Sequence, residues 1–600
     1  MTFGLQKNML SFSTFRERNI VTFLGLITAA FGLYFSSSNF EFIYYDDIRI
    51  LAEHPELYNG PTLRDSVSAI FTLLPREEPL LVRDLSWALD SRIFGFYNPH
   101  GFHFVNVVLH ASIVGLCFLT MLQITRRYAV AVLTAVCFLL LAVHVEPVAW
   151  IMGRKDLLVA FWGFLALIFQ SQALDAKTRS ARYVCYGGVL LALTLALFSK
   201  ISALVFPGVL FFLALFQPVL RGDEPPRGAF PWRRIPQALV GVLPHLIISL
   251  AVFHWYRGVL GEFGVLNRGY TATTLQHIGN LFVLNPLSWL RDLQLILFPW
   301  DMGFLHIWPG NLLHFEAFHM ILASGVWIGL AVLSFILLTR RRDLAFYLLS
   351  FFVLMVPYMN IQYIGIWVAN RYLYFSAFCV MAFLATVTME AWTHGSRPKA
   401  WGAAILIAVM CANNAWCLTA TLPNWRNAET LWGSELRRPN PTPDEFYGLA
   451  SFYYTMAMRA ADPAEREKLF IKTEALVAQA RPLFDKPYVA LQNLLLLDAL
   501  VAIGRNAPDE QRLGALLSAE KVGPYNDAIL WQLMLFYYKK ALPLSDSAPR
   551  DEMARKALAY YSRYRGVINR SVGFAAKDQS IRAEFRADFP GLAADLDNLK

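Results

Sequence analysis

Long apolar segments dominate the first 420 residues of the chain, and each is about as long as a helix that crosses a membrane. Only 16% of the 600 residues are charged and 56% are hydrophobic, whereas roughly a quarter are charged in soluble domains. We therefore predict an all-α polytopic membrane protein with about eleven transmembrane helices. They lie near residues 19–37, 102–125, 128–147, 156–174, 183–199, 201–218, 235–256, 317–339, 344–359, 371–392 and 400–421.

Short basic connections between these segments predict the orientation of the chain. Basic residues beside transmembrane helices favour the cytoplasm, so we expect a cytoplasmic N-terminus and a retained first helix, since no small-residue cleavage site follows it. These connections hold most Lys and Arg of this part, so the net charge of +9 does not indicate a nucleic-acid partner. The basic positions are Lys7, Arg16 and Arg18; Arg126 and Arg127; Lys177, Arg179 and Arg182; Arg221, Arg227, Arg233 and Arg234; Arg340, Arg341 and Arg342; and Arg397 and Lys399.

Two long connections, about 38–101 and 257–316, are then predicted to face outward. The first contains the amphipathic stretch "LRDSVSAIFTLLP". The second is apolar but is interrupted by Pro286, Arg291 and Pro299. This pattern predicts helices that lie on or dip into the membrane surface rather than two more spans.

The composition changes near Pro423, which predicts a transmembrane domain over 1–422 and a soluble helical domain over 423–600. Patterns such as "PDEFYGLASFYYTMAMRAA" and "DAILWQLMLFYYKKAL" fit antiparallel helix pairs stacked like tetratricopeptide repeats. Because the number of predicted spans is odd, we expect this domain on the outer side. The expected location is a bacterial inner membrane, with the C-terminal domain in the periplasm.

Two acidic clusters lie on the predicted outer side. Asp46 and Asp47 follow the first span in "FIYYDDIRILAEHPEL". Neighbouring side chains of an extended segment point apart, so we expect one carboxylate to face a site and the other to support it. His144 and Glu146 follow the third span in "LLLAVHVEPVAWIMGRKDLL", where Pro147 disfavours helical geometry at Glu146. Ionisable groups at membrane depth are usually functional.

Two alternatives stay open for the aspartate pair. It can be a solvated feature of the loop, or it can hold a divalent metal ion, because adjacent carboxylates suit such ions. No other cofactor is indicated. The six cysteines show no CxxC or Cys/His spacing, so they are interpreted as small buried hydrophobes; they are Cys117, Cys137, Cys185, Cys379, Cys411 and Cys417.

Basic residues on the same side indicate an anion site. Arg154 and Lys155 follow the acidic cluster, Lys200 lies between two spans, and Arg371 opens the tenth span in "WVANRYLYFSAF". Lys and Arg are usually enriched on the cytoplasmic side of a membrane protein, so cations on the outer side are unusual. A helix N-terminus, such as that near Arg371, also favours an anion. The alternative is an arginine that reaches along the membrane interface to water. Tyr372 is more typical of an aromatic belt than of a sugar platform.

Several motifs in a fixed order resemble a known family. They are the Tyr-Asp-Asp after the first span, "LSWALDSRIFGFYNPHGFHFVNVVLH", "HVEPVAWIMGRKDLL", "FSKISALVFP", "NRYLYF" and "NWRNAETLWGSELRRPNP". Together they are similar to the membrane O-mannosyltransferases with tetratricopeptide repeats and their bacterial relatives, within the GT-C glycosyltransferase superfamily. The chain differs from the family pattern at two places. Relatives have an Arg-Pro dipeptide, but here no Arg immediately precedes Pro79, and Arg83 is a nearby arginine that could replace it. The chain also has Ser199, Lys200 and Ile201 where relatives have Ser-Lys-Glu.

The resemblance implies an inverting enzyme that moves a sugar from a polyprenyl-phosphate carrier to a hydroxyl of a protein, glycan or lipid acceptor on the outer side. The C-terminal repeats are a candidate docking surface for the acceptor. A carboxylate within reach of the hydroxyl acts as general base, and by family resemblance Asp46 is favoured over Asp47. The other expected roles are orientation for Glu146 and His144, phosphate binding for Arg371, Lys200, Arg154 and Lys155, and shaping of the site for Arg83, Asp84, Asp156 and Tyr372.

Three other functions stay open. An oligosaccharide ligase or polymerase would also use a lipid-linked donor and differs by moving a preassembled chain. A transporter of lipid-linked substrates would show an internal repeat of spans, which the span pattern lacks. A scaffold built around the helical repeats would leave the acids without a role.

Overall fold

The computed structural model describes residues 2–73, 79–228, 230–262, 278–304, 306, 316–359, 366–483, 489–568 and 574–599. Within these residues the fold is all-α, as predicted, and an isolated antiparallel bridge joins His306 to Val368. The chain divides into two compact units. The membrane unit comprises Met1–Arg257 and Tyr270–Asn427, and the C-terminal unit comprises Ala428–Lys600 with Gly258–Gly269.

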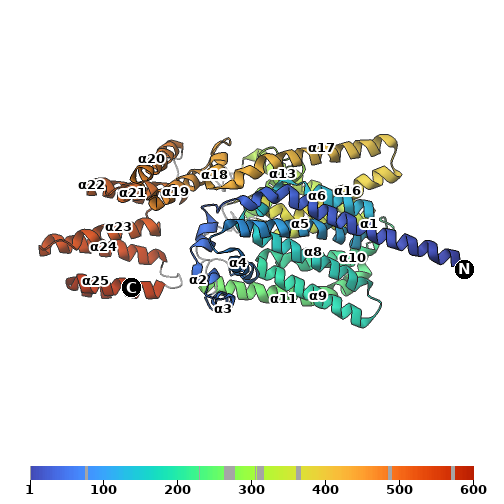
Figure 1. Ribbon diagram of the computed structural model, residues 1–600, viewed down its shortest axis with the longest axis horizontal. Coiled ribbons are helices and arrows are strands. Elements are labelled where there is room, and N and C mark those ends of the chain that lie inside the picture. Colours follow the sequence, from blue (N-terminus) through green and yellow to red (C-terminus); the bar gives the residue numbers. More distant parts are fainter. Residues whose placement is uncertain are drawn as a thin grey trace. The chain divides into compact units, whose positions relative to one another are not determined.

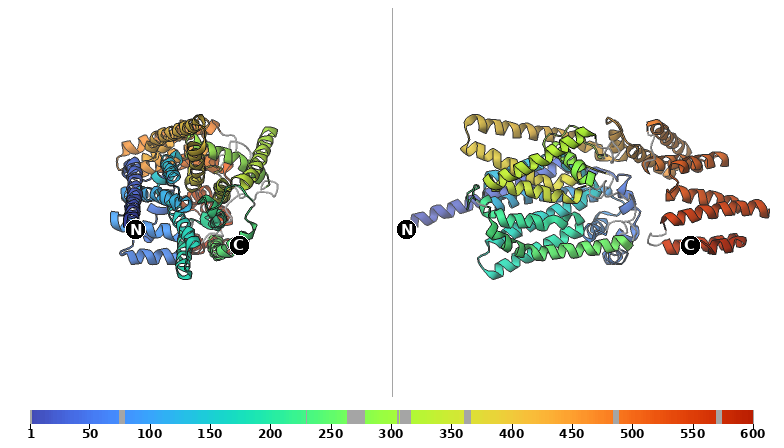
Figure 2. Two further views of the ribbon diagram at one scale, coloured as in Figure 1. Left: turned by 90° about the vertical axis from the view of Figure 1, so that its right-hand side faces the viewer. Right: turned by 180° about the vertical axis from the view of Figure 1, so that it is seen from behind.

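Long helices run side by side in the membrane unit (Figures 1 and 2). Nine helices of the described chain are long and apolar enough to cross a membrane, which makes this a polytopic membrane protein. They are built on α1 (Thr2–Tyr34), α5 (Pro99–Thr125), α8 (Arg154–Asp175), α9 (Arg179–Ser199), α10 (Phe206–Leu220), α11 (Ile235–Glu262), α14 (Ala317–Arg340), α16 (Leu373–His394) and α17 (Arg397–Thr421).

The third predicted span is a broken one. Helix α6 (Tyr128–Leu139) ends early, and the short helices η3 (Ala142–His144) and α7 (Val145–Ala149) continue at an angle of 58° to it. Leu141 has extended backbone at the break. Counted as one span, this pair raises the number in the described chain to ten.

The ninth predicted span, near 344–359, is shorter than a typical transmembrane helix. Helix α15 (Arg342–Met355) has 14 residues and continues as the 3-10 turn η9 (Val356–Tyr358). Together they are about 27 Å long at ordinary rises per residue. Arg342 donates to the carbonyl of Pro225 at one end, and Tyr358 stacks on Tyr372 at the other. The segment therefore joins the two ends of the bundle despite its length.

Short helices follow α1 at the end of the membrane unit opposite the start of that helix (Figure 1). They are η1 (Phe35–Asn39), the π-helical turn η2 (Asp47–Ala52), α2 (Pro55–Tyr58), α3 (Leu63–Leu73) and α4 (Leu81–Phe94). The amphipathic stretch that the sequence indicates is α3. In the second long connection, η8 (Asn280–Leu284) and α13 (Asn285–Leu297) pack into the bundle against α14 and α17, with Trp289 and Leu295 buried.

Basic connections meet at the other end of this bundle. Glu390 pairs with Arg127 at 3.5 Å and with Arg341 at 2.7 Å. Asp175 pairs with Arg221, which also donates to Ser171. Connections that the sequence assigns to one side of the membrane are thus tied together by ion pairs.

The C-terminal unit consists of packed helix pairs. Helix α19 packs on α20, α21 on α22 and α23 on α24. Thr442 and Glu445 form a capping box at the start of α19, which satisfies backbone N–H groups that a helix start leaves free. Its helices are α18 (Ala428–Leu436), α19 (Pro443–Arg459), α20 (Pro463–Ala480), η12 (Arg481–Leu483), α21 (Val489–Gly504), α22 (Asp509–Val522), α23 (Asp527–Ala541), α24 (Ser547–Ile568), α25 (Phe574–Asp588), η13 (Pro590–Leu592) and α26 (Ala593–Asp597).

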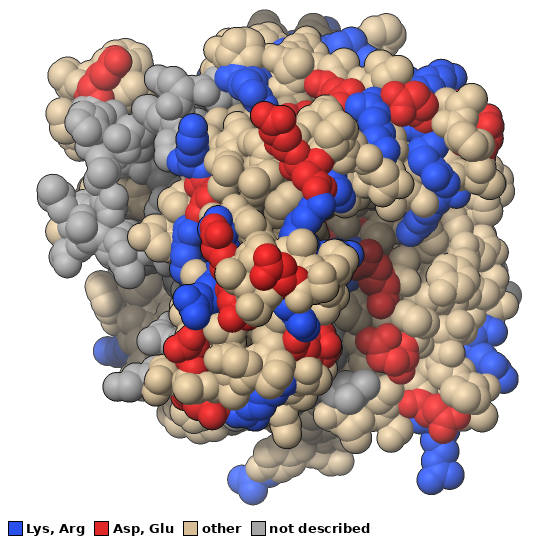
Figure 3. All heavy atoms as spheres, turned by 90° about the vertical axis from the view of Figure 1, so that its left-hand side faces the viewer, with Lys and Arg blue, Asp and Glu red and all other residues tan. Residues whose placement is uncertain are grey.

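Acidic and basic side chains are interspersed on the face shown in Figure 3. Many of those on the C-terminal unit are paired between its helices, as Arg505 is with Glu467 at 2.7 Å. The described part of this face has no extended basic patch of the kind that binds nucleic acid.

Candidate functional site

The break after α6 delivers Glu146 into the interior of the membrane unit. The chain runs through η3, α7 and the turn η4 (Ile151–Gly153) before α8 begins at Arg154. The turn requires glycine at Gly153, because a Cβ there would lie 2.3 Å from the carbonyl oxygen of Pro147. Residues 140–153, called the linker segment below, are buried almost throughout.

Glu146 forms a buried ion pair with Arg371. Glu146 is 1% exposed, and Arg371 belongs to the turn η10 (Asn370–Tyr372) that precedes α16. The guanidinium carbon of Arg371 lies 5.6 Å from the ring centre of Trp150 and 5.1 Å from that of Tyr372. The sequence predicted both charged residues for the site, and the structure brings them together.

A second ion pair lies near Tyr372. The ammonium of Lys200 donates to Asp156 at 2.7 Å. It lies 5.2 Å from the ring centre of Tyr358 and 5.7 Å from that of Tyr372, and these two rings stack with centres 4.4 Å apart. Two cations, each held by an acid, therefore lie close to one pair of stacked tyrosines.

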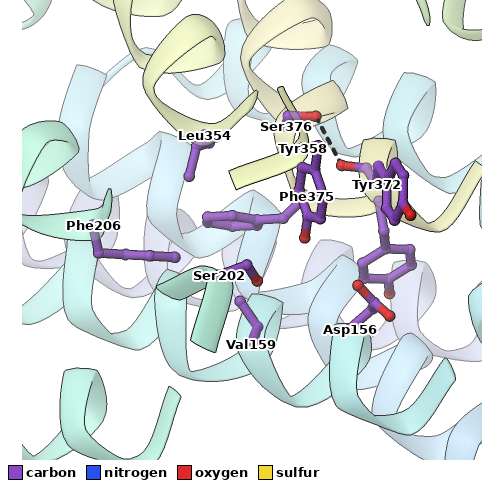
Figure 4. A pocket seen from close by; sticks show the side chains of 10 residues that line it. Asp156, Val159, Ser202, Phe206, Leu354, Tyr358, Tyr372, Phe375 and Ser376 are labelled. Carbon is purple, nitrogen blue, oxygen red and sulfur yellow. Dashed lines mark hydrogen bonds between the residues drawn. The ribbon is translucent and has the colours of Figure 1, made fainter. Parts of the chain in front are cut away.

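A pocket opens beside these ion pairs (Figure 4). Asp156 and Tyr372 lie at one side of it, and Phe206 and Leu354 lie at the other. The remaining lining residues are Val159, Ser202, Tyr358, Tyr374, Phe375 and Ser376. The pocket thus has a polar side next to the two cations and an apolar side between helices.

The two adjacent aspartates face different surroundings. Asp47 is fully buried and accepts a hydrogen bond from the backbone amide of Ile43 at 2.9 Å. Burial raises the pKa of Asp47 from 3.8 to about 8, although this hydrogen bond lowers it. Asp46 keeps 23% of its side chain exposed and pairs with Arg49 at 3.0 Å. One carboxylate thus supports the loop and the other is partly accessible. The two lie at the start of a helical turn rather than on the expected extended segment, and that one of them faces a site stays a prediction.

Asp156, which lines the pocket, retains a buried oxygen, Oδ2, that accepts no hydrogen bond. Buried acceptors normally have partners, so a hydroxyl group of a bound ligand would complete it. No group of three or more His, Cys, Asp or Glu in the described chain is arranged to hold a metal ion, and Asp46 and Asp47 have different partners.

Other residues predicted for the site lie in structural positions. His144 is fully buried between the rings of Phe138 and Tyr374, whose centres lie 4.3 Å and 4.6 Å from its own. Arg83 and Asp84 form a fully buried pair at 2.9 Å within α4. Lys155 is half-buried at the start of α8.

Arg154 is fully buried and engaged by the protein. Its guanidinium donates to Ser86 at 3.1 Å, to Asp90 at 2.7 Å, to the carbonyl of Phe102 at 2.8 Å, and to Asn106. It therefore joins α8 to α4 and α5, rather than offering its charge to a ligand as predicted.

Sequence reasoning missed Trp150, Tyr358 and Asn106. Trp150 lies within the quoted motif between Glu146 and Arg154, and its ring contacts Phe304 with centres 5.4 Å apart. Its position in the motif could have indicated a role. Asn106 likewise lies within a quoted motif, between Leu85 and His110. Tyr358 carries no such signal, because its contacts come from distant segments.

Comparisons with known proteins agree with the order of motifs. The chain is 29% identical over 205 residues to the Protein O-mannosyl-transferase TMTC1 of Mus musculus, covering 32% of this chain and 21% of that protein. It is 25% identical over 401 residues to the Protein O-mannosyl-transferase TMTC4 of Mus musculus, covering 60% and 53%. The match to TMTC1 of Homo sapiens is 29% over 145 residues, covering 22% and 16%.

No family model and no solved structure matches the chain. The chain spans about half or less of the length of these curated relatives. The resemblance predicted from the motifs is confirmed: this chain is similar to protein O-mannosyl-transferases along part of its length.

Proposed function

We propose that the chain is a membrane glycosyltransferase that moves one sugar, mannose in the first instance, from a polyprenyl-phosphate donor to a hydroxyl of a protein on the outer side of the membrane. The two ion pairs that lie close to Tyr358 and Tyr372 beside the pocket carry this proposal. They supply a charged, partly desolvated site at the edge of an apolar pocket. The reaction class and the sugar come from the relatives, which are protein O-mannosyl-transferases.

The donor site is the pocket with its two cations. A phosphate would bind near Arg371 and Lys200, and the first lipid units would lie against Phe206, Leu354 and other apolar residues of the pocket. Both cations are already paired with Glu146 and Asp156. Their acids hold the cations in place, and a phosphate would share their donors through charge-assisted hydrogen bonds. The unpartnered Oδ2 of Asp156, which lines the pocket, would accept from a sugar hydroxyl.

The chemistry requires a base and a stabilised leaving group. The acceptor oxygen forms a bond to the anomeric carbon while the bond from that carbon to the phosphate oxygen breaks, and its electron pair leaves with the phosphate. The acceptor proton passes to a carboxylate. We assign this role to Asp46, because its carboxylate is accessible, and assign support of the loop to Asp47. Cationic stabilisation of the departing phosphate is the main remaining requirement, and no metal ion enters these steps.

The acceptor polypeptide is proposed to dock on the helix pairs of the C-terminal unit, in the periplasm of a bacterium. Substitutions on this surface should then raise the KM for the acceptor and leave the KM for the donor unchanged.

The test is sugar transfer by the purified full-length chain in lipid nanodiscs. Polyprenyl-phosphate mannose with a radiolabelled sugar is supplied with periplasmic proteins of a strain that lacks the gene. Labelled protein that requires the enzyme supports the proposal. Transfer only from a donor that carries a preassembled glycan would show a ligase. No transfer from either donor, by protein that binds both, would contradict a transferase function.

A further inference from the structure

Two buried asparagine side chains hold the linker segment at its two ends. Asn414, on α17, is 1% exposed. Its Oδ1 accepts from the backbone amide of Ala142 at 3.1 Å, at the point where the broken span resumes. Its Nδ2 donates at 3.1 Å to the carbonyls of Ile296 and Leu297, the last residues of α13. One amide group therefore joins the break to the end of another helix.

Asn106, on α5, does the same at the other end of the linker segment. It is fully buried, and its Nδ2 donates to the carbonyl of Trp150 at 2.9 Å. Its Oδ1 accepts from the guanidinium of Arg154, the first residue of α8. Glu146 lies between the two fixed points, Ala142 and Trp150, and Arg371 packs over the ring of Trp150.

Backbone groups freed by a break in a transmembrane helix must find partners inside the protein. A side-chain amide suits this task, because it carries a donor and an acceptor and no charge. At this break the partners come from α5 and α17, which are far from the linker segment in the chain. The position of Glu146 is therefore set by these two helices as well as by its own segment.

We propose that Asn106 and Asn414 are positioning residues that fix the linker segment and thereby place Glu146, and through it the guanidinium of Arg371, for donor binding. The inference rests on the proposed function for its kinetic consequence. Its structural part, that the two amides hold residues 140–153, has a readout that needs no activity.

The chain offers a matched control for Asn414. The neighbouring Asn413 is also on α17 and donates to the carbonyl of Pro299 at 3.2 Å, which is outside the linker segment. Asn413→Ala removes the same chemical group from the same helix without touching the break.

Substitution by aspartate separates the two ends further. Asn414→Asp keeps an acceptor for the amide of Ala142 and loses the donor to Ile296 and Leu297, which lie outside the linker segment. Asn106→Asp keeps an acceptor for Arg154 but loses the donor to the carbonyl of Trp150, which lies inside it. The direct contact with the linker segment is therefore kept by the first substitution and lost by the second.

The first experiment is hydrogen–deuterium exchange, read by mass spectrometry on the full-length chain in nanodiscs. Peptides that contain Ala142 should exchange about tenfold faster in Asn414→Ala, as expected when a hydrogen bond is lost. Their exchange in Asn413→Ala and Asn414→Asp should stay near that of the unsubstituted chain. Equal exchange in Asn414→Ala and Asn413→Ala would overturn the inference.

The second experiment measures transfer kinetics with polyprenyl-phosphate mannose. Asn414→Ala and Asn106→Asp should raise the KM for the donor about tenfold, while kcat changes by less, since the base in the first loop is untouched. Unchanged KM in both variants, at normal folding, would also overturn the inference. If the unsubstituted chain transfers no sugar but the exchange pattern is as expected, then the proposed function fails and the structural holding of the segment stands.

Discussion

Glu146 and Arg371 are 225 residues apart in the chain and form an ion pair inside the membrane unit. Each residue comes from a short turn rather than from the middle of a long helix: Glu146 from α7 after the break, and Arg371 from η10 before α16. Irregular backbone of this kind is tolerated at membrane depth where it is buried in protein or lines a cavity. The pair therefore joins the broken span to the turn that precedes α16, next to the pocket.

The ion pair should serve both stability and donor binding, and a double substitution can separate these effects. Arg371→Met leaves the carboxylate of Glu146 buried without its cation, which should cost about 3–5 kcal/mol of stability. Glu146→Gln with Arg371→Met removes both charges and should recover most of that loss. Donor binding should stay weakened by about 1.5–3 kcal/mol in both variants, because the charge-assisted contact to phosphate is gone.

Thermal unfolding and binding of polyprenyl phosphate to the nanodisc-embedded chain measure the two quantities. Arg371→Lys is the conservative control, and it should bind the donor with intermediate affinity because the fork of the guanidinium is lost. If the double variant regains donor binding along with stability, Arg371 has a structural role only.

Asp47 should make the folded chain less stable as pH rises. Its pKa is about 8 in the folded protein against a usual value of 3.8, so the folded state holds the proton more tightly than the unfolded state. Stability should be highest near pH 4, fall as the pH approaches 8, and change little above that. Asp47→Asn cannot ionise and should lack this fall, while Asp46→Asn should retain it.

The apparent midpoint of thermal unfolding, measured between pH 5 and 9 for the three proteins, checks this expectation. A parallel pH dependence in all three would show that Asp47 does not titrate in this range.

Features that depend on one continuous segment, such as an apolar run or a proline, could be predicted from the sequence. Glu146 was expected at a helix exit because Pro147 follows it. The span does break, but at Leu141, and Glu146 and Pro147 lie in the first turn of α7, where a proline costs no helical hydrogen bond. The apolar lengths predicted most spans, but α15 is shorter than its apolar run because Pro357 stops the helix, and α6 ends at Leu139 before its apolar run is complete.

What the sequence could not predict is which partner each charge finds. Arg154 was expected to bind phosphate because it is a cation beside an acidic cluster. In the fold, its guanidinium donates instead to Asp90 on α4 and to Asn106 on α5. Lys200 was an equal candidate on sequence grounds, yet it lies at the pocket beside Tyr358. Contacts between segments that are distant in the chain decide which cation lies at the pocket, and these contacts cannot be read from a single sequence.

The two ends of the chain should lie on opposite sides of the membrane. The described chain has nine long apolar helices and one broken pair, and α15 joins both ends of the bundle as well. If each of these segments crosses the membrane, the number of crossings is odd, and Lys600 and the connection at Arg341 are expected in different compartments. Reporter fusions that are active only in the cytoplasm or only in the periplasm should give opposite signals at these positions. Equal signals would refute the topology.

The sharpest expectation concerns the two aspartates after α1. In the proposed reaction the sugar is attached to a lipid that stays in the bilayer, so the reacting carbon would be held near the membrane surface, where Asp46 and Asp47 lie just beyond the first span. Asp46→Asn preserves the shape of the side chain but cannot accept a proton. Turnover should therefore fall about 10²- to 10⁴-fold, the usual contribution of a general base, while donor binding stays nearly intact.

Asp47→Asn should cost less, because an amide oxygen can still accept from the backbone amide of Ile43 and keep the loop in place. Transfer assays on both variants, at matched folding, decide between the two carboxylates. The reverse order of effects would make Asp47 the base, in which case its raised pKa should appear as a rise in kcat towards pH 8. If both variants turn over at the rate of the unsubstituted chain, the aspartate pair is a solvated feature of the loop and the base lies elsewhere.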